Sequence, residues 1–81
     1  MTRHRVLLFA RYADILGADA ITIDLPDSPT IAMLIDALRV LPGGELLPAT
    51  LVVARNLSVA RSTDLIAPSD ELALLPPLAG G

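Results

Sequence analysis

The segment that decides the fold is AITIDLPDSPTIAMLIDALRVLPGG, residues 20–44. Its first six residues alternate: Ile21, Ile23 and Leu25 point to one side, and the polar residues Thr22 and Asp24 point to the other. This period of two is typical of a half-buried β-strand. Pro26 ends the strand because proline cannot donate to the hydrogen-bond ladder.

A helix is predicted directly after this strand. Ser28 or Thr30 can cap its first turn, and Pro29 is tolerated there because its missing N–H would have no partner. The apolar residues share one helical stripe, at i, i+3, i+4, i+7 and i+10: Ile31, Leu34, Ile35, Leu38 and Leu41. The Pro-Gly-Gly of residues 42–44 ends the helix.

Outward from this segment, short apolar runs predict further strands. They are residues 6–10 (VLLFA), 50–56 (TLVVARN), 57–60 as a short return strand, and 71–75 (ELALL). Residues 11–17 (RYADILG) form either one helical turn ended by glycine or a loop. The order strand, strand, helix, strand, short strand, strand predicts an α+β fold in which one main helix crosses one face of a small sheet.

Composition narrows the possible functions. At 81 residues the chain is one domain, and its 53% hydrophobic residues supply the dense core that such a small chain needs. The net charge is −3 and the six basic residues, all arginine, are scattered, so no nucleic-acid partner is predicted. No apolar stretch approaches the roughly 18 residues of a membrane span. The absence of cysteine excludes disulfides, thiolate metal sites and a cysteine nucleophile, and is compatible with a cytoplasmic protein.

Side-chain chemistry for catalysis is sparse. His4 is the only histidine, and we predict that it is a plain surface residue of the basic terminus. Asp64, Asp70 and Glu71 could do acid–base work, but a solvated turn in which Asp70 accepts from neighbouring backbone N–H groups is the more typical arrangement. Neither a metal site nor a self-contained active site is predicted.

The chain ends on LLPPLAGG, residues 74–81, which divides it into a domain over residues 1–75 and a tail over residues 76–81. Pro76 and Pro77 favour an extended path, so the tail is expected to leave the last strand in a defined direction. When extended, the tail reaches roughly 20 Å from the domain.

The tip of this tail is chemically simple. Leu78 is followed by Ala79, Gly80 and Gly81, whose side chains are no larger than a methyl group, so the tip can enter a narrow channel. The terminal carboxylate is ionised at neutral pH and can be activated as an acyl-adenylate. The ending therefore predicts that Gly81 is presented to the active site of another protein; a frayed terminus without a role is the alternative.

The sequence resembles the small subunits of molybdopterin synthase, a family of ubiquitin-like β-grasp sulfur carriers in molybdenum-cofactor biosynthesis. The matching segments are VLLFARYADILG (6–17), SPTIAMLIDAL (28–38), ARN (54–56) and SDELALLPPLAGG (69–81). The last is the most specific, because the family combines an acidic pair, an apolar strand, two prolines and a terminal Gly-Gly. The resemblance implies a β-grasp fold with a mixed sheet of about four to five strands.

The resemblance also implies a mechanism. An ATP-dependent adenylyltransferase of the ubiquitin-activating type would adenylate the Gly81 carboxylate, and a persulfide donor would convert it to a thiocarboxylate. The tail would then insert into the large subunit of molybdopterin synthase, in an assembly of two small and two large subunits. There the sulfur would pass to cyclic pyranopterin monophosphate to form the dithiolene. The small subunit would bind no cofactor, and the catalytic side chains would lie on the large subunit.

Positions that match the family predict a partner surface. Phe9, Val59 and Leu75, with the prolines, are expected to form an apolar patch; burial in the core is the alternative for Phe9 and Val59. The family commonly has an arginine where Ala13 stands, and Arg11 is expected to take its place in a partner contact.

Three other functions remain open. The chain could carry sulfur for thiamine or cysteine biosynthesis, although the two prolines before the tip favour molybdopterin. It could be a ubiquitin-like modifier attached to lysines, or an interaction domain whose tail is irrelevant.

Overall fold

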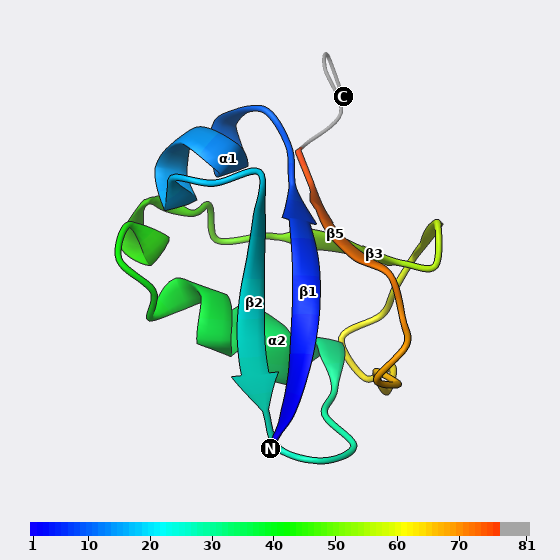
Figure 1. The fold of residues 1–81 in the computed structure, drawn as a ribbon. Helices are drawn as coiled ribbons and strands as arrows, with labels where there is room; N and C mark the ends of the chain where they lie inside the picture. Colours follow the sequence, from blue (N-terminus) through cyan, green and yellow to red (C-terminus); the bar gives the residue numbers. More distant parts are fainter. Residues whose placement is uncertain (77–81) are drawn as a thin grey trace.

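The computed structural model describes residues 1–76 as one mixed sheet with a main helix packed on it (Figure 1). The elements are β1 (Thr2–Leu8), α1 (Arg11–Leu16), β2 (Ala20–Leu25), α2 (Ile31–Arg39), the 3-10 helix η1 (Gly44–Leu46), β3 (Val52–Arg55), β4 (Ser58–Val59) and β5 (Leu72–Leu75). The strand order is β2-β1-β5-β3-β4. β1 is parallel to β5, and the other neighbouring strands are antiparallel. The predicted α+β fold is confirmed.

The segment that decides the fold forms β2 and α2 within the predicted range, with two corrections. Thr30 is the helix cap: its Oγ1 accepts a hydrogen bond from Met33 N at 3.3 Å. Pro29 therefore lies before the helix and not in its first turn. The helix ends at Arg39, so Leu41 packs against the core from the following loop and not from the helical stripe.

Two elements at the start of the chain are decided by tertiary contacts. β1 begins at Thr2, four residues before the predicted strand, because its register pairs Thr2 with Leu25 at the far end of β2. Residues 11–17 form the helical alternative: α1 is closed by Gly17 in the left-handed conformation, with φ 77°.

The hydrophobic core lies between α2 and one face of the sheet. Its central members are fully or nearly fully buried: Val6, Leu8, Leu34, Leu38, Val53, Leu72 and Leu74. Side chains alternate along a strand, so the residues between them, including Leu7 and Ala73, point to the opposite face. We call this second face, which α2 does not cover, the open face.

The end of α2 is tightly packed. A Cβ atom at Gly44 would lie 2.5 Å from the carbonyl oxygen of Arg39, and would also overlap the carbonyl oxygen of Leu38. Only glycine therefore fits where the chain turns from α2 into η1. Within residues 1–76, no helix has the length and apolar character needed to cross a membrane.

Candidate functional site

The strand that leads to the tail, β5, is in the interior of the sheet. It lies between β1 and β3, and its residues Leu72 and Leu74 are fully buried. The strand ends at Leu75, at the end of the sheet where α1 lies (Figure 1), and half-buried Pro76 follows. The remaining tail residues for which a role is predicted lie outside the described part of the chain: Pro77, Leu78, Ala79, Gly80 and Gly81. The core strand thus sets the point from which the tail leaves.

Arg11 lies at this point of exit. It lines a cavity of about 290 Å³ together with Tyr12, Leu46, Pro48 and Pro76. Tyr12 is 2% exposed and anchors α1 to the core, whereas Arg11 is exposed. The guanidinium is therefore carried on a fixed helix beside the first residue of the tail.

The predicted apolar patch is on the open face. Phe9 is 46% exposed and Leu75 is half-buried, and both line a shallow cavity of about 240 Å³. Val59 is 69% exposed and pairs with Ala54, which lines the same cavity. Phe9 and Val59 are therefore surface residues, and the core alternative does not hold for them. Their role in binding a partner stays a prediction.

Three further residues complete the surface that we call the open-face patch. They are Leu7, Leu57 and Ala73, which line the cavity with Phe9 and Leu75. Leu57 is exposed because it occupies the hairpin turn between β3 and β4, where Asn56 and Leu57 both have positive φ. The patch extends from the end of β1 across β5 to this turn, so it lies on the strand that leads to the tail.

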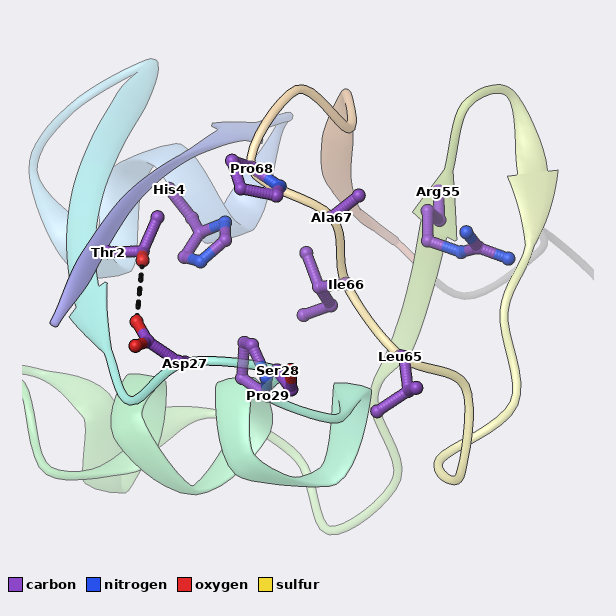
Figure 2. A pocket seen from close by; sticks show the side chains of 10 residues that line it. All are labelled: Thr2, His4, Asp27, Ser28, Pro29, Arg55, Leu65, Ile66, Ala67 and Pro68. Atoms are coloured by element: carbon purple, nitrogen blue, oxygen red, sulfur yellow. Dashed lines mark hydrogen bonds between the residues drawn. The ribbon is translucent and has the colours of Figure 1, made fainter.

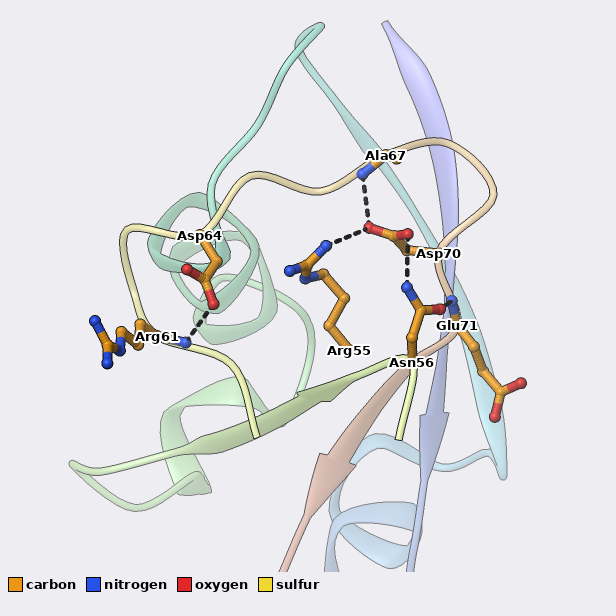
Figure 3. Close-up of polar contacts among 7 residues, drawn as sticks. All are labelled: Arg55, Asn56, Arg61, Asp64, Ala67, Asp70 and Glu71. Atoms are coloured by element: carbon orange, nitrogen blue, oxygen red, sulfur yellow. Dashed lines mark hydrogen bonds and ion pairs between the residues drawn. The ribbon is translucent and has the colours of Figure 1, made fainter. Parts of the chain in front are cut away.

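A polar cluster fixes the beginning of β5 (Figure 3). Asp70 Oδ2 accepts from Ala67 N at 2.8 Å and from Arg55 Nη1 at 3.4 Å, while Asp70 Oδ1 accepts from Asn56 Nδ2 at 2.9 Å. Asn56 Oδ1 in turn accepts from Glu71 N at 2.9 Å. We call Arg55, Asn56 and Asp70 the strand clamp, because they join the end of β3 to the start of β5.

The electrostatics of the strand clamp favour the ionised carboxylate. The hydrogen bond from Ala67 N, then that from Asn56, and then Arg55 lower the pKa of Asp70 below its usual value; partial burial opposes them. The prediction that Asp70 accepts from a neighbouring backbone N–H is confirmed, but the turn is not a solvated one at this residue, because the Asp70 side chain is only 9% exposed. Asp64 belongs to a separate turn, where its Oδ2 accepts from Arg61 N at 2.9 Å. Among residues 1–76, no three His, Cys, Asp or Glu side chains gather as a metal site.

Local sequence patterns do not reveal the roles of Arg55 and Asn56. They identify ARN only as a strand end that matches the family, and they predict a turn in which Asp70 contacts the backbone alone. A signal for these roles is the pair of polar segments ARN, at the end of one predicted strand, and SDE, at the start of another. That their side chains meet follows from the pairing of β3 with β5, in which Arg55 lies opposite Leu72.

The prediction that His4 is a surface residue is wrong. His4 is 2% exposed, because the extended β1 places it on the core face, two residues before Val6. Its imidazole lines a cavity of about 540 Å³ with Pro29, Ile66 and Pro68 (Figure 2). Neither ring nitrogen has a hydrogen-bond partner in the described part of the chain. This cavity lies at the end of β1 remote from Pro76.

Comparison with known proteins agrees with this arrangement. Residues 6–81 match the model of the ThiS family. The chain is 36% identical over 81 residues to a molybdopterin synthase sulfur carrier subunit of Dictyostelium discoideum, covering 95% of this chain and 94% of that protein. It is 32% identical over 78 residues to the protein of the same name in Arabidopsis thaliana, covering 95% and 81%.

Solved structures support the fold. The crystal structure of small archaeal modifier protein 1 from Haloferax volcanii matches with a TM-score of 0.80 and 28% identity, covering 98% of this chain and 99% of that one. A putative molybdopterin converting factor, subunit 1, from Pyrococcus furiosus has a TM-score of 0.84 at 20% identity, covering 96% and 100%. The predicted ubiquitin-like β-grasp fold is thereby confirmed. On the family match and the two relatives of similar length, the chain belongs to the ThiS family.

Proposed function

We propose that this protein is the sulfur carrier subunit of a molybdopterin synthase, and that its C-terminal glycine carries the sulfur. The observation that carries the proposal is the continuity between β5 and the tail. The central strand, anchored by the fully buried Leu72 and Leu74, is followed directly by Pro-Pro-Leu-Ala-Gly-Gly, so a rigid domain presents a small-residue terminus. The names of the two relatives above 30% identity support the same conclusion.

The proposed chemistry takes place at the terminal carboxylate. The Gly81 carboxylate attacks the α-phosphorus of ATP on an adenylyltransferase of the ubiquitin-activating type, and pyrophosphate leaves. The terminal sulfur of a persulfide donor then attacks the acyl carbon and displaces AMP. A thiol reduces the resulting acyl disulfide, which leaves the thiocarboxylate on the carrier and a disulfide on the donor side. ATP is a substrate of the activating enzyme and not a cofactor of this chain.

The loaded tail then enters the large subunit. There the thiocarboxylate gives its sulfur to cyclic pyranopterin monophosphate, and water restores the carboxylate. A dithiolene holds two sulfur atoms, so each product requires two loaded carriers. This requirement supports an assembly of two small and two large subunits, with the catalytic side chains on the large subunit. The lack of cysteine is consistent with this role in the cytoplasm, because the sulfur is carried on the terminus and not on a side chain.

The proposed docking surface is the open-face patch together with Arg11. Phe9 and Leu75 lie on the face that α2 leaves uncovered, and Arg11 lies beside Pro76. A partner that binds there contacts the domain next to the tail it receives. A solved neighbour that is a protein–protein complex of subunits 1 and 2 of a molybdopterin-converting factor has this fold at 18% identity and a TM-score of 0.70, covering 99% of this chain and 100% of that one.

Reconstitution tests the proposal. The protein is incubated with ATP, the activating enzyme and a persulfide donor, and its C-terminal peptide is examined by mass spectrometry. We expect a shift equal to the replacement of one oxygen by sulfur at Gly81, followed by dithiolene formation when the large subunit and its substrate are added. Deleting Gly81, or extending the chain beyond it, should abolish both. Sulfur loading without dithiolene formation by an authentic large subunit would assign the carrier to another pathway, such as thiamine or cysteine biosynthesis.

A protein-modifier role is the second candidate. It is favoured by the 28% identity to small archaeal modifier protein 1 over nearly the whole chain. A modifier would form isopeptide bonds from Gly81 to lysines of target proteins. This sequence contains no lysine, so it offers no side chain on which a second copy could be attached in the same way. Adducts that carry a Gly-Gly remnant on target lysines, sought in the native cell by mass spectrometry, would establish this function.

A further inference from the structure

We propose that the outer edge of β2, which has no neighbouring strand within residues 1–76, is a docking site for an extended peptide segment with basic residues at its ends. β2 is the first strand in the sheet order, with β1 as its neighbour on one side (Figure 1). It has six residues, whereas β4 at the opposite edge has two. The inference is independent of the proposed function, because the tail leaves from β5.

The backbone groups that face this edge can be identified. Leu8 N donates to Asp19 O at 2.8 Å, which makes this a hydrogen-bonded pair of the antiparallel ladder between β1 and β2. Such pairs alternate along an antiparallel ladder, so the N–H and C=O groups of Ala20, Thr22 and Asp24 point away from β1. The edge therefore offers alternating donors and acceptors at the spacing of an added strand.

A side-chain pocket accompanies this backbone edge. A cavity of about 310 Å³ lies beside the strand and is lined by Leu16, Ile21, Thr22, Leu41 and Pro42. Four of these five residues are apolar, so the cavity suits one aliphatic side chain of the added strand. Backbone hydrogen bonds combined with a pocket for an alternate side chain constitute the β-augmentation mode of peptide recognition.

Few of the features with which proteins usually protect an edge strand occur in β2, where Asp24 is the one charged residue. The pairing of β2 with β1 is continuous from Ala20 to Leu25, and no proline or lysine occurs in this stretch. The side chain of Asp24 is engaged on the open face with Arg3, at 3.4 Å. The edge is thus available for pairing along its whole length.

The charge along the edge of β2 indicates which kind of peptide is expected to bind there. Asp19 precedes the strand and Asp27 follows it, and both are exposed, so acidic groups occur at both ends, whereas Asp24 within the strand is paired with Arg3. A second copy pairing through the same strand would double this negative charge, and the whole chain already carries a net charge of −3. An extended segment with an apolar centre and arginine or lysine at its ends is complementary to the edge.

Nuclear magnetic resonance can test this proposal with a matched pair of synthetic peptides. The probe is acetyl-RTVIVTR-amide, and its control, acetyl-ETVIVTE-amide, has the same centre with acidic ends. We expect saturable shifts of β2 amides with the basic peptide and weaker binding of the acidic one. Hydrogen exchange should slow at Ala20, Thr22 and Asp24, but change little at Ile21 and Ile23, whose N–H groups already bond to β1.

Two substitutions at one position separate the backbone contact from the side chain. Thr22→Pro removes an outward N–H without removing a bond to β1, and should weaken binding about tenfold. Thr22→Ala keeps the N–H and removes only part of one side chain that lines the pocket, so it should weaken binding less than Thr22→Pro does. The proposal is overturned if neither peptide binds, if both bind equally, or if β2 shifts depend on protein concentration alone, which would indicate a second copy. The exchange pattern of the unmodified protein decides the question even if Thr22→Pro fails to fold.

Discussion

Asp70 is the residue at which the loop after β4 becomes β5. Its carboxylate accepts hydrogen bonds from the backbone of Ala67 and from the side chains of Asn56 and Arg55. Hydrogen bonds to a charged group each contribute about 1.5–3 kcal/mol when the group is shielded, and less when water competes. The position of the first residues of β5 therefore depends on one side chain.

Replacing Asp70 by alanine should destabilise the fold. The change leaves the Ala67 N–H and the Asn56 amide without their acceptor, so we expect a loss of roughly 1–3 kcal/mol in the free energy of unfolding. Urea denaturation followed by circular dichroism measures it. Glu71→Ala is the matched control, because the Glu71 side chain is exposed and makes no hydrogen bond in the described structure. If the two variants are equally stable, the strand clamp does not hold β5.

The same carboxylate predicts a pH dependence. The pKa of Asp70 is lower in the folded state than in the unfolded chain. The stabilisation that the ionised carboxylate gives to the folded state is therefore fully present above the unfolded pKa of about 3.9. The contribution is lost as the pH falls through the folded pKa. We therefore expect the stability difference between the unmodified protein and Asp70→Asn to shrink as the pH falls below about 4. A difference that stays constant from neutral pH into that range would contradict the assignment.

For His4 we expect substitution to preserve or increase stability, the opposite of the effect expected for Asp70. Its buried imidazole has no hydrogen-bond partner for either nitrogen within residues 1–76. Replacing an unsatisfied buried polar group by an apolar one removes a desolvation cost of about 1–3 kcal/mol. His4→Leu should therefore leave the free energy of unfolding unchanged or raise it, as measured by urea denaturation at neutral pH. A marked loss of stability would mean that the imidazole has a partner, such as a bound water.

At the scale of elements, the junction between α2 and η1 has no room for a side chain at Gly44. Gly44 packs against the carbonyl groups of Leu38 and Arg39, so the turn that follows the helix has no room for a side chain. Gly17, which closes α1, has open space around its missing Cβ and requires glycine only for its positive φ. These two glycines serve different physical purposes.

The two purposes can be separated by alanine substitution. Gly44→Ala forces backbone atoms apart, and overpacking of this kind typically costs about 1–3 kcal/mol. Gly17→Ala meets no neighbour, and the left-handed conformation costs it roughly 1 kcal/mol. Thermal unfolding should therefore show a lower midpoint for Gly44→Ala than for Gly17→Ala. The reverse order would mean that the loop relaxes to accommodate the added methyl group.

At the scale of the whole molecule, the two faces of the sheet have different roles: one stabilises the fold, and the other is exposed next to the strand that leads to the tail. One face is covered by α2 and forms the core, while the open-face patch remains exposed on the opposite side. β5 belongs to both, since Leu72 and Leu74 point into the core and Leu75 contributes to the patch. The strand that leads to the tail is thus held from one side and accessible from the other.

A change on the open face should affect partner binding and not folding. Phe9 is 46% exposed and lies outside the core, so Phe9→Asp removes less buried surface than a core substitution would. It places a charge in the proposed interface, and we expect at least a tenfold weaker affinity for the large subunit, measured by isothermal titration calorimetry. The thermal midpoint should stay close to that of the unmodified protein. Unchanged affinity would remove Phe9 from the docking surface.

Local sequence patterns were sufficient to predict the position of several elements. β2 has the predicted bounds and α2 starts at the first residue of its predicted stripe, because alternation, a capping threonine and a helical apolar stripe are properties of neighbouring residues. The partition into a domain and a tail over residues 76–81 stays a prediction, and it too rests on local composition.

The features that local patterns do not predict depend on pairing between segments that are far apart in the chain. Thr2 to Arg5 have no strand pattern of their own, yet they form β1 and bury His4 because β2 supplies hydrogen-bond partners for them. Asn56 meets Asp70 because β3 lies beside β5, a neighbour that comes after it in the chain. The sequence by itself determined the local elements and the chemistry of the terminus. Only the tertiary structure decided which side chains are buried, which residues clamp β5 and which edge stays free, since these depend on contacts between residues far apart in the chain.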